Sequence, residues 1–173
     1  MTAERCLAIN LLLMDVDGVL TDGGIVYTSR GDELKAFHVR DGSGLKLWTG
    51  QGKRAGIITG RSSEVVARRA AELGLDPVIQ GAADKGAALD RILTQLNKRP
   101  EQVCYVGDDV IDLPAMRRVG LAVAPADACA EAKADAHYVT SAAGGRGAVR
   151  EVIELILKSQ GAWDAIVARY RSE

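Results

Sequence analysis

The chain has 173 residues, with 22 basic and 23 acidic side chains and a formal net charge of −1. This length predicts one domain that can bury a core without disulfides or a structural metal. The charge balance argues against a basic nucleic-acid-binding protein and against a disordered acidic tail protein. The three cysteines have no C-x-x-C spacing, which argues against a disulfide framework or a zinc site.

The first apolar run, residues 11–14, is far shorter than the roughly 20 residues that cross a membrane, and it leads directly into acidic residues. We therefore expect a soluble, cytoplasmic protein without a signal peptide. The same run is continuously apolar, as is typical of a strand buried on both faces. Two further apolar stretches, 25–27 and 34–39, flank a turn-rich link and predict a β-hairpin.

Short apolar runs and longer helical patterns then alternate along the chain. Helices are predicted at residues 44–51 and 62–73; Ser62 or Ser63 begins the second, and Gly74 ends it. Further helices are predicted at 85–96, 113–119, 129–134 and 149–157, the last extended by 163–170. Strands are predicted at 55–59, 77–79, 103–106, 121–123 and 138–139.

Strands that alternate with helices in this way predict an α/β fold: a Rossmann-like parallel sheet flanked by helices, with a small β-hairpin insertion at about 24–39. In an open parallel sheet, ligands bind beyond the carboxyl ends of the strands. Asp15, Asp17 and Gly18 follow the first strand, Thr59 and Arg61 follow the second, and Asp108, Asp109 and Asp112 follow Gly107. Lys85 opens the helix before the 103–106 strand and can reach the same rim.

Carboxylates crowded at one rim repel one another unless a cation lies among them. Oxygen ligands without Cys or His favour a hard divalent ion, most simply Mg²⁺. Together with a hydroxyl and an ammonium group they predict a phosphoryl-transfer site. Asp15 is then the candidate nucleophile and Asp17 the candidate general acid and base, with Thr59 and Lys85 as phosphate or charge partners. Asp15, Asp17 and Asp108 are the expected metal ligands, supported by Asp109 and Asp112 from a second layer.

Each piece also has a purely structural interpretation: a turn for Asp15–Gly18, a helix cap for Asp109 or Asp112, and a solvated helix start for Lys85. Their occurrence in this order, three of them at predicted strand ends, favours catalysis. In this arrangement the chain resembles the haloacid dehalogenase superfamily of phosphohydrolases. Within it, residues 15–23, 34–42 and 143–151 resemble the branch that acts on 3-deoxy-D-manno-octulosonate 8-phosphate, an intermediate of lipopolysaccharide synthesis.

The resemblance implies a single phosphatase domain over residues 1–173 without a cap domain, because no insertion of sufficient length separates the motifs. It also implies a homotetramer assembled through the hairpin, and a C-terminal flap and helix at about 141–173. A neighbouring subunit would close the site, with Arg146 on a mobile, basic flap. The substrate contacts implied by the resemblance are Asp17, His38, Val39, Arg40, Asp41, Gly42, Lys46, Arg61, Arg69, Lys85 and Arg146.

Two alternatives remain open on the sequence: a phosphatase of nine-carbon, sialic-acid-like sugar-acid phosphates, and a non-catalytic tetramerisation module. The first would keep every catalytic assignment. The second is disfavoured because Asp15, Asp17 and Lys85 are all present. His38 has an equally good interpretation as a hairpin-end residue without a ligand. Neither nucleic acid nor membrane is an expected partner.

Overall fold

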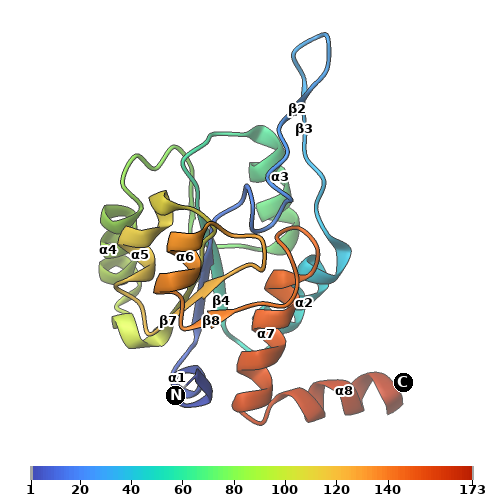
Figure 1. Cartoon of the computed structure of the whole chain (residues 1–173). Coiled ribbons are helices and arrows are strands. Elements are labelled where there is room, and N and C mark those ends of the chain that lie inside the picture. Colours follow the sequence, from blue (N-terminus) through green and yellow to red (C-terminus); the bar gives the residue numbers. More distant parts are fainter. Residues whose placement is uncertain (1, 173) are drawn as a thin grey trace.

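Six parallel strands form the sheet at the centre of the molecule, in the order β5-β4-β1-β6-β7-β8 (Figure 1). A computed structural model describes residues 2–172. In chain order the strands are β1 (Leu11–Met14), β4 (Arg54–Ile58), β5 (Val78–Ile79), β6 (Val103–Val106), β7 (Leu121–Ala124) and β8 (Tyr138–Val139). β1 lies between β4 and β6 with every residue buried, which explains its unbroken apolar sequence. The predicted α/β parallel sheet is confirmed.

Helices cover both faces of the sheet, and each face has its own core. The side chains of β1 alternate between the two: Leu12 and Met14 join one core, and Leu11 and Leu13 join the other. The first core is covered by α1 (Thr2–Leu7), α2 (Val39–Gly50), α3 (Glu64–Leu73), α7 (Ala148–Ser159) and α8 (Trp163–Ser172). The second is covered by α4 (Lys85–Leu96), α5 (Leu113–Met116) and α6 (Ala130–Asp135), with the 3₁₀ turns η1 (Pro100–Gln102) and η2 (Val110–Asp112) nearby.

A β-hairpin of β2 (Val26–Tyr27) and β3 (Glu33–Leu34) projects from the rim where the strands of the large sheet end (Figure 1). α1 and α8 lie at the opposite end of the molecule. Within residues 2–172, no helix combines the length and the apolar character needed to cross a bilayer.

Most predicted elements are confirmed, several with their ends. The helix at 85–96 and the strands at 103–106 and 138–139 have the predicted bounds. Ser63 caps α3 through a hydrogen bond from Val66 N, and Gly74 ends that helix with a φ of 67°. The residues from Trp163 form a separate helix, α8, because α7 ends at Ser159 and Gly161 follows it with a φ of 70°.

Two predictions between residues 34 and 51 are wrong. The second hairpin strand ends at Leu34 rather than at Val39, and the helix predicted to begin at Gly44 begins at Val39. Gly42 and Gly44 weakened the helical pattern, since glycine is a poor helix former. Packing explains both glycines: a Cβ on Gly42 would lie 2.3 Å from Arg69 Nη2, and one on Gly44 would lie 3.0 Å from Arg150 Cδ on α7. The short helix α1 was not predicted from the sequence.

Candidate active site

Three carboxylates and one ammonium group meet at the rim of the sheet. Asp15 directly follows β1, Asp108 lies two residues after β6, and Asp112 ends η2. Each contributes an oxygen to a cluster whose atoms all lie within 4.8 Å of one another. Lys85, the first residue of α4, places Nζ 2.8 Å from Asp15 Oδ2 and 2.6 Å from Asp112 Oδ1. The rim therefore brings together four of the predicted residues.

Asp112 has both of its carboxylate oxygens engaged within the protein. Oδ1 accepts hydrogen bonds from Lys85 and from the Tyr105 hydroxyl, the latter at 2.8 Å, and Oδ2 accepts from the backbone N–H groups of Asp108 and Asp109 at 3.1 and 3.2 Å. This fits its predicted supporting place behind the metal ligands. Tyr105 was missed by the sequence analysis because its position in a buried strand gives no sign that its hydroxyl points to the rim.

The cluster carries more negative than positive charge in a poorly solvated place. Burial, followed by the nearby charges of Asp112 and Asp15, raises the pKa of Asp108 to about 7. Burial also raises the pKa of Asp15, against the attraction of Lys85. For Lys85, burial opposes the charged form, but attraction to Asp15 and Asp112 prevails and its pKa is raised. Without a further cation, the excess negative charge is relieved only by protonation.

The donor set fits a magnesium ion. Within the described residues, Oδ1 of Asp15 and Oδ1 of Asp108 are buried and accept no hydrogen bond. Such orphaned carboxylate oxygens are costly unless a proton or a cation satisfies them. Oxygen ligands alone favour a hard divalent cation, and the few carboxylates that Mg²⁺ takes leave its other positions to water and phosphate. Asp15 and Asp108 are thus the residues best placed to hold Mg²⁺.

The loop after β1 passes very close to Asp108. Gly18 has a φ of 91°, and a Cβ there would lie 2.0 Å from Asp108 Oδ2. Only glycine allows this approach. Thr59, the residue after β4, is 3% exposed and follows its strand at the same rim.

The carboxylate of Asp17 lies outside the three-carboxylate cluster. It is bound instead by Lys35 through a short hydrogen bond to Oδ1, and Arg61 Nε lies 3.5 Å from Oδ2. The Asp109 side chain is turned to its own backbone, where it accepts a hydrogen bond from Val110 N. The prediction that Asp17 also ligates the metal stays a prediction.

The segment 38–42, predicted to contact substrate, forms the start of α2. Val39 and Arg40 are exposed there, whereas Asp41 and Gly42 are buried. Asp41 has a structural partner at the other end of the chain: it accepts hydrogen bonds from Gly147 N at 3.2 Å and Arg150 N at 2.8 Å, and so caps α7. Burial raises its pKa despite these bonds. His38 Nδ1 lies 3.7 Å from the same carboxylate.

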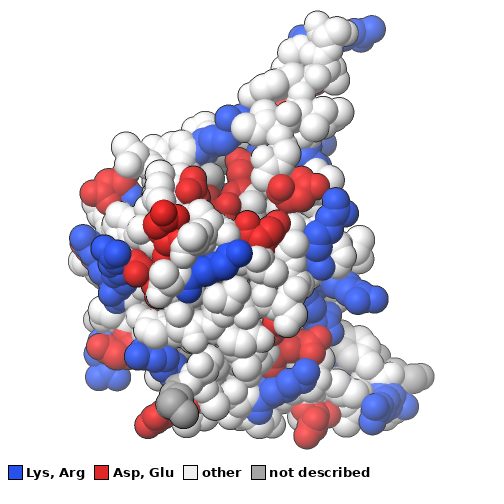
Figure 2. Space-filling view, in the orientation of Figure 1, with Lys and Arg blue, Asp and Glu red and all other residues white. Residues whose placement is uncertain are grey.

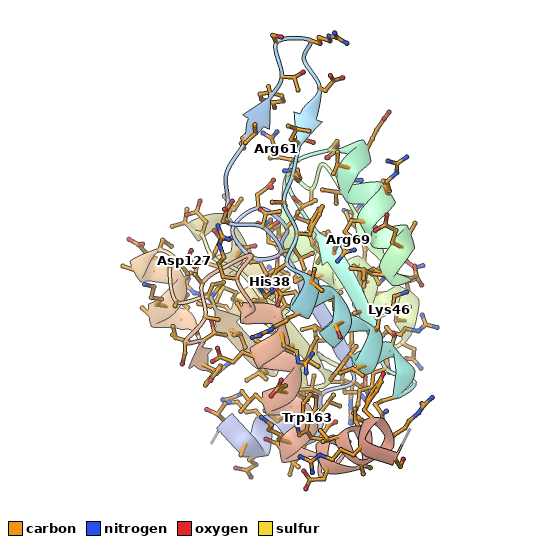
Figure 3. The ribbon with its side chains drawn as sticks, turned by 90° about the vertical axis from the view of Figure 1, so that its right-hand side faces the viewer. His38, Lys46, Arg61, Arg69, Asp127 and Trp163 are labelled. Carbon is orange, nitrogen blue, oxygen red and sulfur yellow. The ribbon has the colours of Figure 1, made fainter. Side chains whose placement is uncertain are left out.

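Cationic side chains line the side of the site next to this segment (Figure 3). Arg69 lies over the ring of Phe37, with 5.6 Å from Cζ to the ring centroid, and also pairs with Glu72. Lys46, farther out on α2, donates to the backbone oxygen of Glu72 at 2.6 Å. A depression of about 290 Å³ opens here, lined by Lys35, Phe37, Val39, Val65, Arg68, Arg69 and Glu72. In Figure 2 the acidic side chains gather under the hairpin, with basic ones beside them.

The predicted flap is packed on the loop that follows β1 in its own chain. Gly144 and Gly145 are buried, and Gly145 N donates to Val19 O at 2.9 Å. Gly144 N donates to Asp127 Oδ1 at 2.9 Å. A side chain on Gly144 would lie 1.8 Å from Gly18 O. The backbone is therefore held in place, and only the exposed side chain of Arg146, paired with Asp22 at 3.1 Å, extends into solvent.

A Rossmann-like sheet with a buried aspartate–lysine pair and unsatisfied carboxylate oxygens at its rim is the arrangement expected of the phosphoryl-transfer hydrolases. Residues 38–120 match the family of haloacid dehalogenase-like hydrolases. The 3-deoxy-D-manno-octulosonate 8-phosphate phosphatase KdsC of Yersinia pestis is 49% identical over 91% of this chain and 84% of its own. Its Escherichia coli K12 counterpart is 50% identical over 90% and 83%.

A solved structure extends the similarity to the whole fold. The 3-deoxy-D-manno-octulosonate 8-phosphate phosphatase of Moraxella catarrhalis, in complex with magnesium ion, phosphate ion and KDO, superposes with a TM-score of 0.96. It is 45% identical, and the match covers 98% of this chain and 97% of that one. The chain therefore belongs to the haloacid dehalogenase-like hydrolases, in the family of the 3-deoxy-D-manno-octulosonate 8-phosphate phosphatases.

Proposed function

We propose that the protein is a Mg²⁺-dependent phosphatase that hydrolyses 3-deoxy-D-manno-octulosonate 8-phosphate to KDO and phosphate, through an aspartyl-phosphate intermediate. The observation that carries this proposal is the buried Asp15, held by Lys85 at 2.8 Å, beside Asp108 at the rim. The substrate follows from relatives about half identical over nine-tenths of the chain. The reaction would serve lipopolysaccharide synthesis in the cytoplasm.

Asp15 is the nucleophile in this proposal. Lys85 binds Oδ2 and fixes the orientation of the carboxylate, while Oδ1 has no hydrogen bond within the described residues. Attack by an oxygen of Asp15 forms the aspartyl phosphate and breaks the bond between phosphorus and the sugar oxygen. Thr59 and the backbone amides of the 15–18 loop are the donors for the phosphoryl oxygens.

Asp17 is the general acid and base. It gives its proton to the leaving sugar oxygen, which departs as an alcohol, and then takes a proton from the water that attacks the aspartyl phosphate. Bound Mg²⁺ would neutralise charge on the carboxylates and the phosphate. Asp15 and Asp108 would hold the ion, with Asp17 as the third predicted ligand, and Asp112 keeps Lys85 and the 107–109 turn in place.

The sugar acid adds a carboxylate to be recognised. Arg69 is the best candidate for this contact, because a guanidinium group binds carboxylates through two parallel hydrogen bonds. Arg61, Lys46, the 38–42 segment and the exposed Arg146 are the further proposed contacts of the substrate. Since 1–173 acts as one phosphatase domain without a cap, we propose that closure depends on self-association as a homotetramer.

The test is phosphate release with Mg²⁺ from the eight-carbon substrate and from a nine-carbon 2-keto acid 9-phosphate, with and without EDTA. We expect preference for the eight-carbon substrate and loss of activity with EDTA. Asp15→Asn should lower turnover by at least about 10⁴-fold, as expected for loss of a nucleophile, with an unchanged fold by circular dichroism. Preference for the nine-carbon substrate would change only the substrate. Release from neither would favour the non-catalytic module.

A further inference from the structure

The carboxylate of Asp17 contacts two cationic side chains from different parts of the chain. Lys35 directly follows β3 and donates to Oδ1. Arg61 comes from the loop after β4, and its Nε lies 3.5 Å from Oδ2. The Lys35 side chain is only 1% exposed, so its ammonium group is enclosed within the site. Asp17 therefore has a hydrogen bond from Lys35 on Oδ1, whereas Oδ2 lies at ion-pair distance from Arg61 and accepts no hydrogen bond from Arg61 Nε.

Both cations are in turn held by one carboxylate, that of Glu33 on β3. Its Oε1 accepts a hydrogen bond from Arg61 Nη2 at 3.2 Å and lies 3.5 Å from Lys35 Nζ. Its Oε2 accepts a short hydrogen bond from Ser63, the N-cap of α3. The hydrogen bond from Ser63, together with Arg61 and Lys35, lowers the pKa of Glu33 and keeps it ionised.

These hydrogen bonds and ion pairs form a chain of contacts that links the start of α3 to the carboxylate of Asp17. Ser63 is fixed by the start of α3, and it fixes one oxygen of Glu33. The other oxygen of Glu33 fixes Lys35 and Arg61, and these orient Asp17. A lysine is a flexible point charge on a long stem, so its position depends on such a tether. Arg61 has a further restraint, because Nη2 also donates to the Tyr27 hydroxyl at 3.0 Å. Figure 3 shows Arg61 at the base of the hairpin.

We propose that Glu33 is a positioning residue for Asp17, acting through Lys35 and Arg61, so that the hairpin belongs to the proton-transfer machinery. This inference rests on the proposed function, since it requires Asp17 to protonate the leaving oxygen. General acid catalysis contributes about 10²–10⁴ in rate, and it depends on the donor lying within hydrogen-bond reach of the leaving atom. If Lys35 and Arg61 are held less firmly, Asp17 is oriented less well and part of this rate contribution is lost.

Loss of general acid catalysis affects esters with poor leaving groups more than esters with good ones, whereas loss of folded structure affects both equally. An alkyl oxygen needs a proton to leave, whereas a p-nitrophenolate leaves readily without one. The ratio of kcat/KM for ethyl phosphate to kcat/KM for p-nitrophenyl phosphate therefore measures the help of the acid. kcat/KM is the right quantity because it reports the steps up to release of the leaving group. Ethyl phosphate has no sugar-acid contacts to confuse the comparison.

The experiment compares Glu33→Gln with Glu64→Gln. The first substitution keeps the size of the side chain and removes its charge. Glu64 is an exposed carboxylate next to Ser63 in the first turn of α3, so its substitution removes the same charge close by. We expect Glu33→Gln to lower kcat/KM for ethyl phosphate about tenfold, a part of the general-acid factor, and that for p-nitrophenyl phosphate less than about threefold. Glu64→Gln should leave the ratio unchanged.

Lys35 provides a second test if Glu33→Gln does not fold. Lys35→Arg keeps a cation for Asp17 and should retain most of the ratio, whereas Lys35→Met should lower it. Equal loss on both esters, or no loss, would overturn the inference for Glu33. A wild-type protein that releases no phosphate from any ester would instead overturn the proposed function, so the two failures are distinguishable.

Discussion

At the scale of single residues, the contact between Gly18 and Asp108 is the tightest steric demand among the acidic residues of the site. A methyl group on residue 18 would occupy the place of Asp108 Oδ2, 2.0 Å away, in a backbone conformation with a φ of 91°. Gly18→Ala must therefore displace Asp108. We expect Mg²⁺-dependent phosphate release to fall about 10- to 100-fold, the scale of loss when a ligand's support is removed. Activity and Mg²⁺ titrations measure this directly.

Gly52 provides the matched control. It also has a positive φ, of 72°, but within the described part of the chain nothing lies within 4 Å of a Cβ built there. Gly52→Ala therefore adds only the backbone strain, about 1–2 kcal/mol. We expect lower stability with nearly wild-type activity. If both variants lost activity equally, the left-handed backbone rather than the clash with Asp108 would explain the effect.

The raised pKa of Asp108 has a consequence for stability. Its pKa is about 7 in the folded protein against 3.8 for a free side chain. Between these values the folded protein holds a proton that the unfolded chain has released, so this group makes the metal-free protein less stable as pH rises from about 4 to about 7. Asp108→Asn removes the titration. We expect the metal-free variant to melt above the wild type at about pH 8, with a difference that shrinks towards about pH 4.

The measurement is Tm in EDTA at several pH values, where about 2–4 °C corresponds to about 1 kcal/mol for a chain of this size. The wild type should also gain stability from added Mg²⁺ at the alkaline end of this range, and the variant should gain much less. A metal-free variant that melts below the wild type there would show that the buried negative charge is compensated by other groups.

At the scale of elements, the start of α7 depends on a residue more than a hundred positions away. Asp41 is 1% exposed and accepts from the N–H groups of Gly147 and Arg150. Asp41→Ala leaves both donors without this partner. We expect a loss of about 2–3 kcal/mol in urea unfolding, at the upper end for unsatisfied buried groups. Faster amide hydrogen exchange at Gly147 and Arg150 would locate the loss.

Asp84→Ala is the comparison for that variant. Asp84 caps α4 locally, accepting from Ala87 N at 3.0 Å, and is exposed to solvent. Loss of such a cap costs about 1 kcal/mol. If the two variants lost equal free energy of unfolding, and amide hydrogen exchange at Gly147 did not change, Asp41 would not be the residue that stabilises the start of α7. Its predicted contact with the sugar acid would then be the better account of its burial.

The elements also show what the sequence can and cannot reveal. Local signals located α3 and α4, because Ser63, Gly74 and the apolar spacing at 85–96 act within a few residues. The position of the site was predicted from the polar residues that directly follow the predicted strands. The start of α2 was misjudged because its glycines are explained by Arg69 and α7, which are distant in sequence.

The support of the site was missed for the same reason. Glu33 and Lys35 have their partners at residues 61, 63 and 17, and Tyr105 meets Asp112 only after the turn at 107–109 is folded. A linear motif contains the reacting groups. The contacts that orient them depend on the tertiary fold.

At the scale of the whole molecule, the hairpin projects from the body of the chain (Figure 1). Its two strands have two residues each, and an isolated two-stranded hairpin is only marginally stable in water. Val26 and Leu34 are opposite each other in the antiparallel pair and are 51% and 53% exposed. Ile25 and Tyr27 add further exposed apolar surface. Such a patch is typical of a protein–protein contact.

We therefore expect the proposed homotetramer to depend on this face. The double variant Val26→Asp, Leu34→Asp places charges on the cross-strand pair, and burying them between subunits would be strongly unfavourable. Sedimentation velocity should show about four chains of 18.3 kDa for the wild type and a single chain for the variant. Leu7→Asp is the control, since Leu7 is 61% exposed but lies on α1, at the opposite end of the molecule (Figure 1). A wild type that sediments as one chain would contradict the tetramer, and dissociation by Leu7→Asp would move the interface to the α1 end.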